Sequence, residues 1–111
     1  MSEVHINIPQ LKQKEGSSFT ATAYFRDGET ASAPTTAKYR VDCLTTGTVL
    51  QDWTSLTPAV SNSIAITATH NAIQDQSNKT EKKQITVAGN PDTATQYRNT
   101  ITYKIENIRN I

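Results

Sequence analysis

The side chains best suited to chemistry in this chain are Cys43 and Trp53, which lie ten positions apart. In immunoglobulin domains a core tryptophan packs on a disulfide that joins the two sheets. Cys43 is the chain's single cysteine, so this disulfide cannot form within the chain. Because Cys43 alternates with Tyr39 and Val41, we expect its thiol to face the core as a small hydrophobic group. Trp53 ends the following strand and is predicted to cover the core.

The remaining candidates for catalysis or cofactor binding form no recognisable site. Nucleophilic catalysis needs a base beside the nucleophile, and the two histidines, His5 and His70, lie in no catalytic motif. The spacing of cysteine and histidine matches no zinc site. The four glycines are dispersed and form no phosphate-binding loop. We therefore expect a protein that is not an enzyme and that uses no metal or cofactor.

Length and charge narrow the range of partners. The chain has 111 residues, which suits a single domain spanning residues 1–111. Its formal net charge is +1, so the composition gives no electrostatic reason to expect nucleic acid or a membrane as a partner. One charged run, Lys79, Glu81, Lys82 and Lys83, is typical of a solvated face.

Neither a membrane span nor an export signal is visible in the sequence. A helix that crosses a bilayer needs about 20 apolar residues, and no run approaches that length. Residues 1–10 lack the basic and apolar regions of a signal peptide. We expect a soluble protein.

Alternation of apolar and polar residues predicts an all-β protein. Helical spacing is absent over any long window, and the eighteen threonines suit the solvated face of a sheet. The predicted strands are 4–8, 18–26, 37–44, 49–53, 63–69, 83–88 and 93–108. About seven strands with short turns indicate a two-sheet antiparallel β-sandwich. Immunoglobulin-like and jelly-roll strand orders both remain open, because alternation does not encode long-range pairing.

Two connections have their own signals. Residues 45–48 form a turn with Gly47 at the positive-φ position, which predicts a hairpin between 37–44 and 49–53. Residues 70–76 are predicted to form a single helical turn, with Asn71 as its cap and Ile73 pointing inward.

Residues 37–108 carry a further pattern. The stretch "TAKYRVDCLTTGTVLQDWTSLTPAVSNSIAITATHNAI", followed by "EKKQITV" and "YKIENI", resembles a family of small tailed-phage head-associated β-sandwich proteins. The N-terminal "INIPQLKQKEGSSFTATAYFRDG" is similar to the capsid decoration proteins among them.

This resemblance implies a structural virion protein, made in the host cytoplasm and located on the capsid exterior. Such a cement protein binds the outer surface of an icosahedral head as a homodimer and bridges subunits of the major capsid protein. By hypothesis an extended arm at 9–17 and a tail at 107–111 make the contacts. The candidate contact residues are Leu11, Lys12, Lys14, Ile108 and Ile111.

Two other functions are compatible with the sequence. A head-completion or tail-associated immunoglobulin-like protein would occupy the portal or tail instead of the shell. A glycan-binding module for host adhesion would need an exposed aromatic platform. Only Trp53, Tyr24 and the tyrosines of the last strand could supply it.

Overall fold

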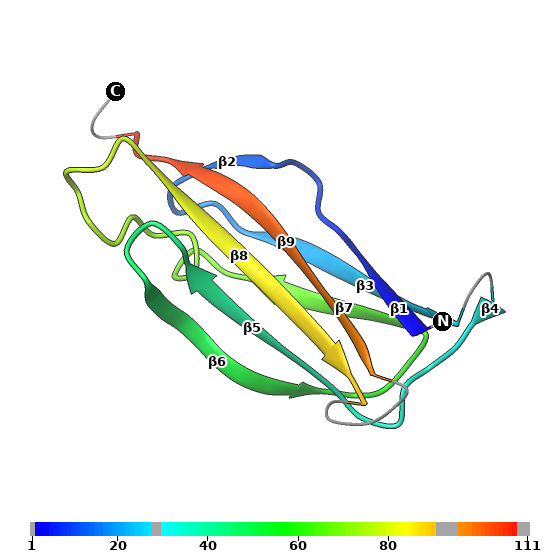
Figure 1. The fold of residues 1–111 in the computed structure, drawn as a ribbon. Helices are drawn as coiled ribbons and strands as arrows, with labels where there is room; N and C mark the ends of the chain where they lie inside the picture. The colour runs from blue at the N-terminus through cyan, green and yellow to red at the C-terminus, as the bar shows by residue number, and fades with distance from the viewer. Residues whose placement is uncertain (1, 28–29, 91–95, 109–111) are drawn as a thin grey trace.

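Strands make up the regular structure of this protein, as the alternation of its sequence predicts (Figure 1). The computed structural model describes residues 2–27, 30–90 and 96–108. In chain order the strands are β1 (Ser2–Asn7), β2 (Lys12–Lys14), β3 (Phe19–Asp27), β4 (Thr30–Ala31), β5 (Ala37–Cys43), β6 (Thr48–Leu56), β7 (Ser61–Ile66), β8 (Thr80–Gly89) and β9 (Tyr97–Glu106). The predicted all-β fold is confirmed.

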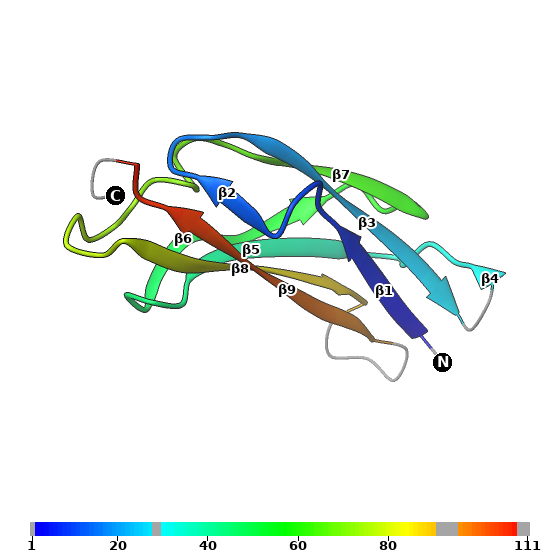
Figure 2. The same cartoon turned by 90° about the horizontal axis from the view of Figure 1, so that it is seen from above.

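The strands form two sheets that lie face to face (Figure 2). In the four-stranded sheet, β3 pairs with β1, β7 and the short β4. The five-stranded sheet has the order β2-β9-β8-β5-β6, in which β2 runs parallel to β9 and the other pairs are antiparallel. An immunoglobulin sandwich has strands A, B and E in one sheet and strands C, F and G in the other. The same division holds here, with β1, β3 and β7 in one sheet and β5, β8 and β9 in the other. The fold is therefore immunoglobulin-like, and the jelly-roll alternative is wrong.

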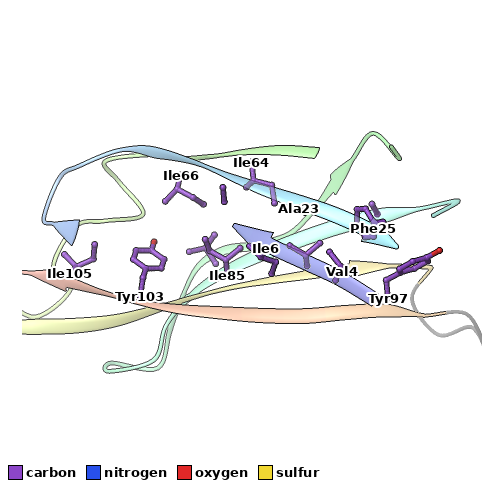
Figure 3. Packing of buried hydrophobic residues seen from close by; sticks show 14 of the residues in the cluster. Val4, Ile6, Ala23, Phe25, Ile64, Ile66, Ile85, Tyr97, Tyr103 and Ile105 are labelled. Carbon is purple, nitrogen blue, oxygen red and sulfur yellow. The ribbon is translucent and has the colours of Figure 1, made fainter. Parts of the chain in front are cut away.

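Apolar side chains from both sheets fill the space between them. Figure 3 shows Phe25, Ile64 and Ile66 of the four-stranded sheet facing Ile85 and Tyr103 of the five-stranded sheet. The wider cluster includes Val4, Ile6, Ala21, Ala23, Ala37, Val41, Ile73, Val87, Tyr97 and Ile105. Two edge-to-face ring pairs join the sheets, Phe19 with Tyr103 at 5.3 Å and Phe25 with Tyr97 at 5.4 Å between ring centroids.

The predicted hairpin is present, but its second strand does not alternate as expected. Gly47 has a φ of 72° in the turn between β5 and β6. Tyr39 pairs with Thr54, and Val41 pairs with Gln51, so Asp52 and Trp53 together lie opposite Arg40. An extra residue of this kind is a β-bulge. A second register shift follows between the Val41–Gln51 and Asp42–Val49 pairs. Trp53 lies beside Arg40 on the solvent side, and the prediction that it covers the core is wrong.

The predicted N-terminal arm is part of the five-stranded sheet. Lys12 pairs with Lys104, and Lys14 pairs with Glu106, as β2 extends the sheet beyond β9. The C-terminal segment also begins on the domain, because Asn107 is fully buried and its amide group donates hydrogen bonds to Gln76 and Asn78. Neither segment reaches outward as an arm in the described residues.

Candidate interaction surface

The solvent side of the five-stranded sheet gathers most of the chain's basic residues, and we call it the cationic face. Its cations are Lys12, Lys14, Lys38, Arg40, Lys82, Arg98 and Lys104. Its carboxylates, among the described residues, are Asp42, Asp52 and Glu106. This face thus holds seven of the eleven Lys and Arg residues and a net of about four positive charges, although the whole chain has a net charge of only +1. Positive charge is therefore concentrated on one face of the molecule, although the net charge of the chain is close to zero.

Three of these cations surround Trp53. The Lys38 Nζ atom lies 4.5 Å from the centre of the indole ring, and the Cζ atoms of Arg40 and Arg98 lie 5.7 Å and 5.9 Å from it. The attraction of a cation to an aromatic ring extends to about 6 Å. We call these four residues the tryptophan cluster. The strand register brings Lys38 and Arg98 to opposite sides of the same residue, because both pair with the small Ala88 on the central strand β8.

Arg40 is held in place by a carboxylate of its own strand. Its Nε and Nη2 atoms donate to the two carboxylate oxygens of Asp42, at 3.1 Å and 2.8 Å. These contacts raise the pKa of Arg40, since the hydrogen bonds favour the charged form. The tryptophan cluster is therefore a fixed arrangement of charges.

Three lysines lie side by side at the other end of the cationic face. Lys104 is directly opposite Lys82 on one neighbouring strand and Lys12 on the other, and we call these three residues the lysine row. Like charges directly opposite one another destabilise a sheet. Only part of this repulsion is offset by Glu106, whose Oε1 atom lies 2.8 Å from the Lys12 Nζ atom. The lysine row thus presents three adjacent cations, one of them paired with Glu106, to an external anion.

The solvent side of the four-stranded sheet has a different character. A shallow hollow of about 300 Å³ lies between His5, Asn7, Tyr24 and Arg26. The Tyr24 side chain is 36% exposed, but it is on the opposite sheet from Trp53. Since the tyrosines of β9 are buried, these residues do not form the aromatic platform that glycan binding would require.

The charged run that the sequence places on a solvated face is divided between surface and core. Glu81 and Lys83 are buried, whereas Lys79 and Lys82 are exposed. The Lys83 Nζ atom donates to Glu81 at 3.1 Å and to the Ala72 carbonyl oxygen at 2.8 Å. The prediction of a solvated face is wrong for these two residues, because strand alternation turns them inward at the end of the sandwich.

The residues considered for catalysis do not come together. Cys43 is fully buried, and its thiol points toward Glu81 at 3.7 Å. His70 is buried and its Nδ1 atom accepts a hydrogen bond from the Thr67 backbone, while burial lowers its pKa. His5 lies on the opposite sheet and is half exposed. Among the described residues, no group of three or more His, Cys, Asp and Glu is arranged to hold a metal ion.

The predicted contact residues lie at the edge of the cationic face. Lys12 and Lys14 extend that face on β2, and Leu11 and Ile108 are 62% and 49% exposed. Ile111 lies outside the described residues. The predicted turn lies earlier than residues 70–76, because the Asn71 N–H donates to the Thr67 carbonyl oxygen at 3.2 Å, and Ile73 is buried as expected. Within the described ranges, no helix is long and apolar enough to cross a membrane.

Sequence reasoning missed the charge polarity. Lys38, Arg40, Arg98 and Lys104 occupy the positions of the predicted strands that alternation assigns to solvent, and Lys82 directly precedes the strand predicted at 83–88. That signal is present in the sequence. The signal does not predict a common charged surface until the strand order is known, because β5, β8 and β9 become neighbours only through long-range pairing.

Comparisons with known proteins support the fold of this chain but no function. The sequence matches no known protein family and no curated protein. Among solved structures, the chain is similar to a conjugative transposon lipoprotein from Bacteroides eggerthii, with a TM-score of 0.54 and 15% sequence identity. The match covers 92% of this chain and 95% of that chain. At this identity it supports the β-sandwich and transfers no activity.

The expectation of a phage capsid protein is corrected by this result. A solved structure that shares the fold is a conjugative transposon lipoprotein, and no curated protein matches the sequence. The predicted capsid decoration role, with its head-completion, tail-associated and glycan-binding alternatives, is therefore wrong. The major capsid protein and the dimer rest on the resemblance alone and stay predictions.

Proposed function

We propose that this protein is a non-catalytic binding module that holds an acidic partner against its cationic face. The observation that carries this proposal is the placement of seven of eleven basic residues on one side of one sheet. Such a patch attracts and orients an acidic partner even where the net charge of the molecule is near zero.

The architecture of the face supports binding over catalysis. Cation–π contacts and the Arg40–Asp42 pair hold the tryptophan cluster in position, so less side-chain freedom is lost when an anion binds. The most nucleophilic group, the Cys43 thiol, is fully buried and has no route to a substrate in this conformation.

Cation-exchange chromatography at pH 7 tests the proposal. The wild-type chain should elute at higher salt than its net charge of +1 would suggest, because the exchanger meets the patch and not the average charge. Arg98→Gln and Lys104→Gln should each elute earlier. Arg26→Gln is the matched control, since it removes one positive charge from the opposite sheet.

A soluble polyanion provides the second measurement. Poly-glutamate should bind with an affinity that falls steeply with salt, as expected when several cations act together. If Arg26→Gln weakens both retention and poly-glutamate binding as much as the two cationic-face variants do, the patch has no special role and the proposal fails.

A further inference from the structure

Large apolar side chains are exposed around the lysine row. Four of the exposed large hydrophobic residues belong to the five-stranded sheet or its immediate continuations, namely Leu11, Leu44, Val49 and Ile108, with exposures of 62%, 45%, 49% and 49%. Tyr24 and Val60, which are also exposed, lie on the side of the four-stranded sheet. Isolated exposed aliphatic residues are ordinary, but several beside one charged row are not.

Backbone contacts fix these residues beside the lysines. The Leu11 carbonyl oxygen accepts a hydrogen bond from the Lys104 backbone at 2.8 Å. The Leu44 backbone N–H donates to the Lys82 carbonyl oxygen at 2.8 Å. Two of the three lysines, the central Lys104 and the outer Lys82, therefore each have a leucine directly alongside.

The remaining two residues lie at the same end of the sandwich. Val49 pairs with Asp42, next to the turn that joins β5 and β6. Ile108 is two residues beyond Glu106, at the end of β9. Figure 1 shows the β5–β6 turn and the end of β9 together at the left. We call the lysine row with Leu11, Leu44, Val49 and Ile108 the basic–apolar end.

This combination suits one kind of acidic partner better than others. A lysine or arginine near an anionic membrane surface gains on the order of 1 kcal/mol, and exposed aliphatic side chains gain by entering the boundary between headgroups and acyl chains. A nucleic acid or a soluble acidic protein would satisfy the lysines and leave the aliphatic residues in water. Single-stranded nucleic acid would also need stacking aromatic side chains, whereas the exposed apolar residues beside the lysine row are leucine, valine and isoleucine.

We infer that the acidic partner of the proposed function is an anionic lipid surface, on which the protein docks through its basic–apolar end. The lysine row meets the lipid phosphates and carboxylates, and the four aliphatic side chains enter the interface. Trp53 stays outside it, because the tryptophan cluster is centred on Ala88, six residues along β8 from Lys82, or roughly 20 Å. The protein therefore stands on its end and does not lie flat on the cationic face.

Vesicle sedimentation tests this inference. The full chain should sediment with vesicles of phosphatidylcholine containing about one third phosphatidylserine, and not with phosphatidylcholine alone. Lys82→Gln with Lys104→Gln should weaken partitioning about thirtyfold, or about fivefold for each lysine. Leu11→Ser with Leu44→Ser should weaken it at least fivefold, because these side chains leave water on docking.

Two matched controls lie on the other sheet. Arg26→Gln is matched to each single lysine substitution, and Val60→Ser to each single leucine substitution. Both controls should partition as the wild type does. Trp53 fluorescence should keep its emission maximum when vesicles are added. A blue shift would contradict end-on docking.

The outcomes separate this inference from the proposed function. Retention on the cation exchanger and poly-glutamate binding without vesicle binding would overturn the lipid inference and leave the acidic-partner proposal standing. Vesicle binding that depends on the lysines but not on Leu11 and Leu44 would also overturn it, since the surface would then be a general anion site. Loss of all three kinds of binding would overturn both.

Discussion

The Nζ atom of Lys83 lies 3.1 Å from the Oε1 atom of Glu81, and both side chains are completely buried. The Glu81 carboxylate also accepts hydrogen bonds from the backbone N–H groups of Gln74 and Asp75, at 2.7 Å and 2.9 Å. Lys83 in turn donates to the Ala72 carbonyl oxygen. This pair therefore fastens the connection between β7 and β8 to the end of the five-stranded sheet.

Replacing Lys83 with methionine should destabilise the fold by about 3 to 5 kcal/mol, because it leaves a buried carboxylate without its cation. Urea unfolding followed by circular dichroism measures the change. Lys82→Met is the matched control: the neighbouring lysine is exposed, and its replacement should change stability by about 0.5 kcal/mol or less. Equal effects of the two substitutions would show that the buried pair does not stabilise the fold.

Stability should fall in acid because of Glu81. Burial by itself raises the pKa of its carboxyl group, but hydrogen bonds from Gln74, Asn78 and Asp75 outweigh burial and lower the pKa to about 2. The unfolded chain, with an ordinary glutamate pKa of 4.5, takes up the proton first. The stabilising contribution is therefore complete above about pH 4.5 and is lost as the pH falls toward about 2.

Urea midpoints between pH 3 and pH 7 measure this dependence, and Glu81→Gln should flatten the curve. Glu106 provides the comparison, because its hydrogen bond to Lys12 also lowers its pKa, but at a solvated site. Glu106→Gln should change the curve less, since exposed pairs contribute little. A curve that keeps its wild-type slope in Glu81→Gln would assign the acid sensitivity to other groups.

Gly89→Ala should destabilise the protein by about 1 to 3 kcal/mol through overpacking. A Cβ atom at this position would lie 2.9 Å from a ring carbon of Phe25 and 2.9 Å from the Cβ atom of Pro34. The ring and the proline both belong to the packed interior, so neither can move aside freely. Thermal unfolding measures the loss, and an unchanged midpoint would mean that the interior yields at this point.

The Cys43 thiol should react slowly with a thiol reagent in the native protein and rapidly in denaturant, because it is fully buried. A chain with Cys43→Ala and Leu44→Cys moves the thiol to the adjacent exposed position and should react rapidly when native. Rapid labelling of native Cys43 would show that this end of β5 opens readily.

Most of the strands could be predicted because side-chain alternation is a local property. The turn at Gly47 and the inward direction of Cys43 follow from a few neighbouring residues, and both predictions are confirmed. The direction of Trp53 could not be predicted, because two register shifts against β5, one opposite Arg40 and one between Val41 and Asp42, interrupt the alternation of β6. A bulge of this kind depends on the partner strand.

The candidate surface was less accessible to sequence reasoning than the fold. Leu11 and Ile108 could be selected because they are apolar residues outside the clear alternation of the strands. Lys82 and Lys104 looked like unrelated surface residues, since 22 positions separate them and only the pairing of β8 with β9 makes them neighbours.

The order of neighbouring residues was enough to predict that the chain forms strands and which face most strand residues occupy, and the single cysteine rules out a disulfide within the chain. These properties depend on the order of neighbouring residues and on the presence of one cysteine. The tertiary structure decided the immunoglobulin-like strand order, the buried Glu81–Lys83 pair and the concentration of positive charge on one sheet. Net charge is the sum over all charged residues of the chain, whereas a partner contacts a single face. Only the pairing of distant strands assigns each charged residue to a face.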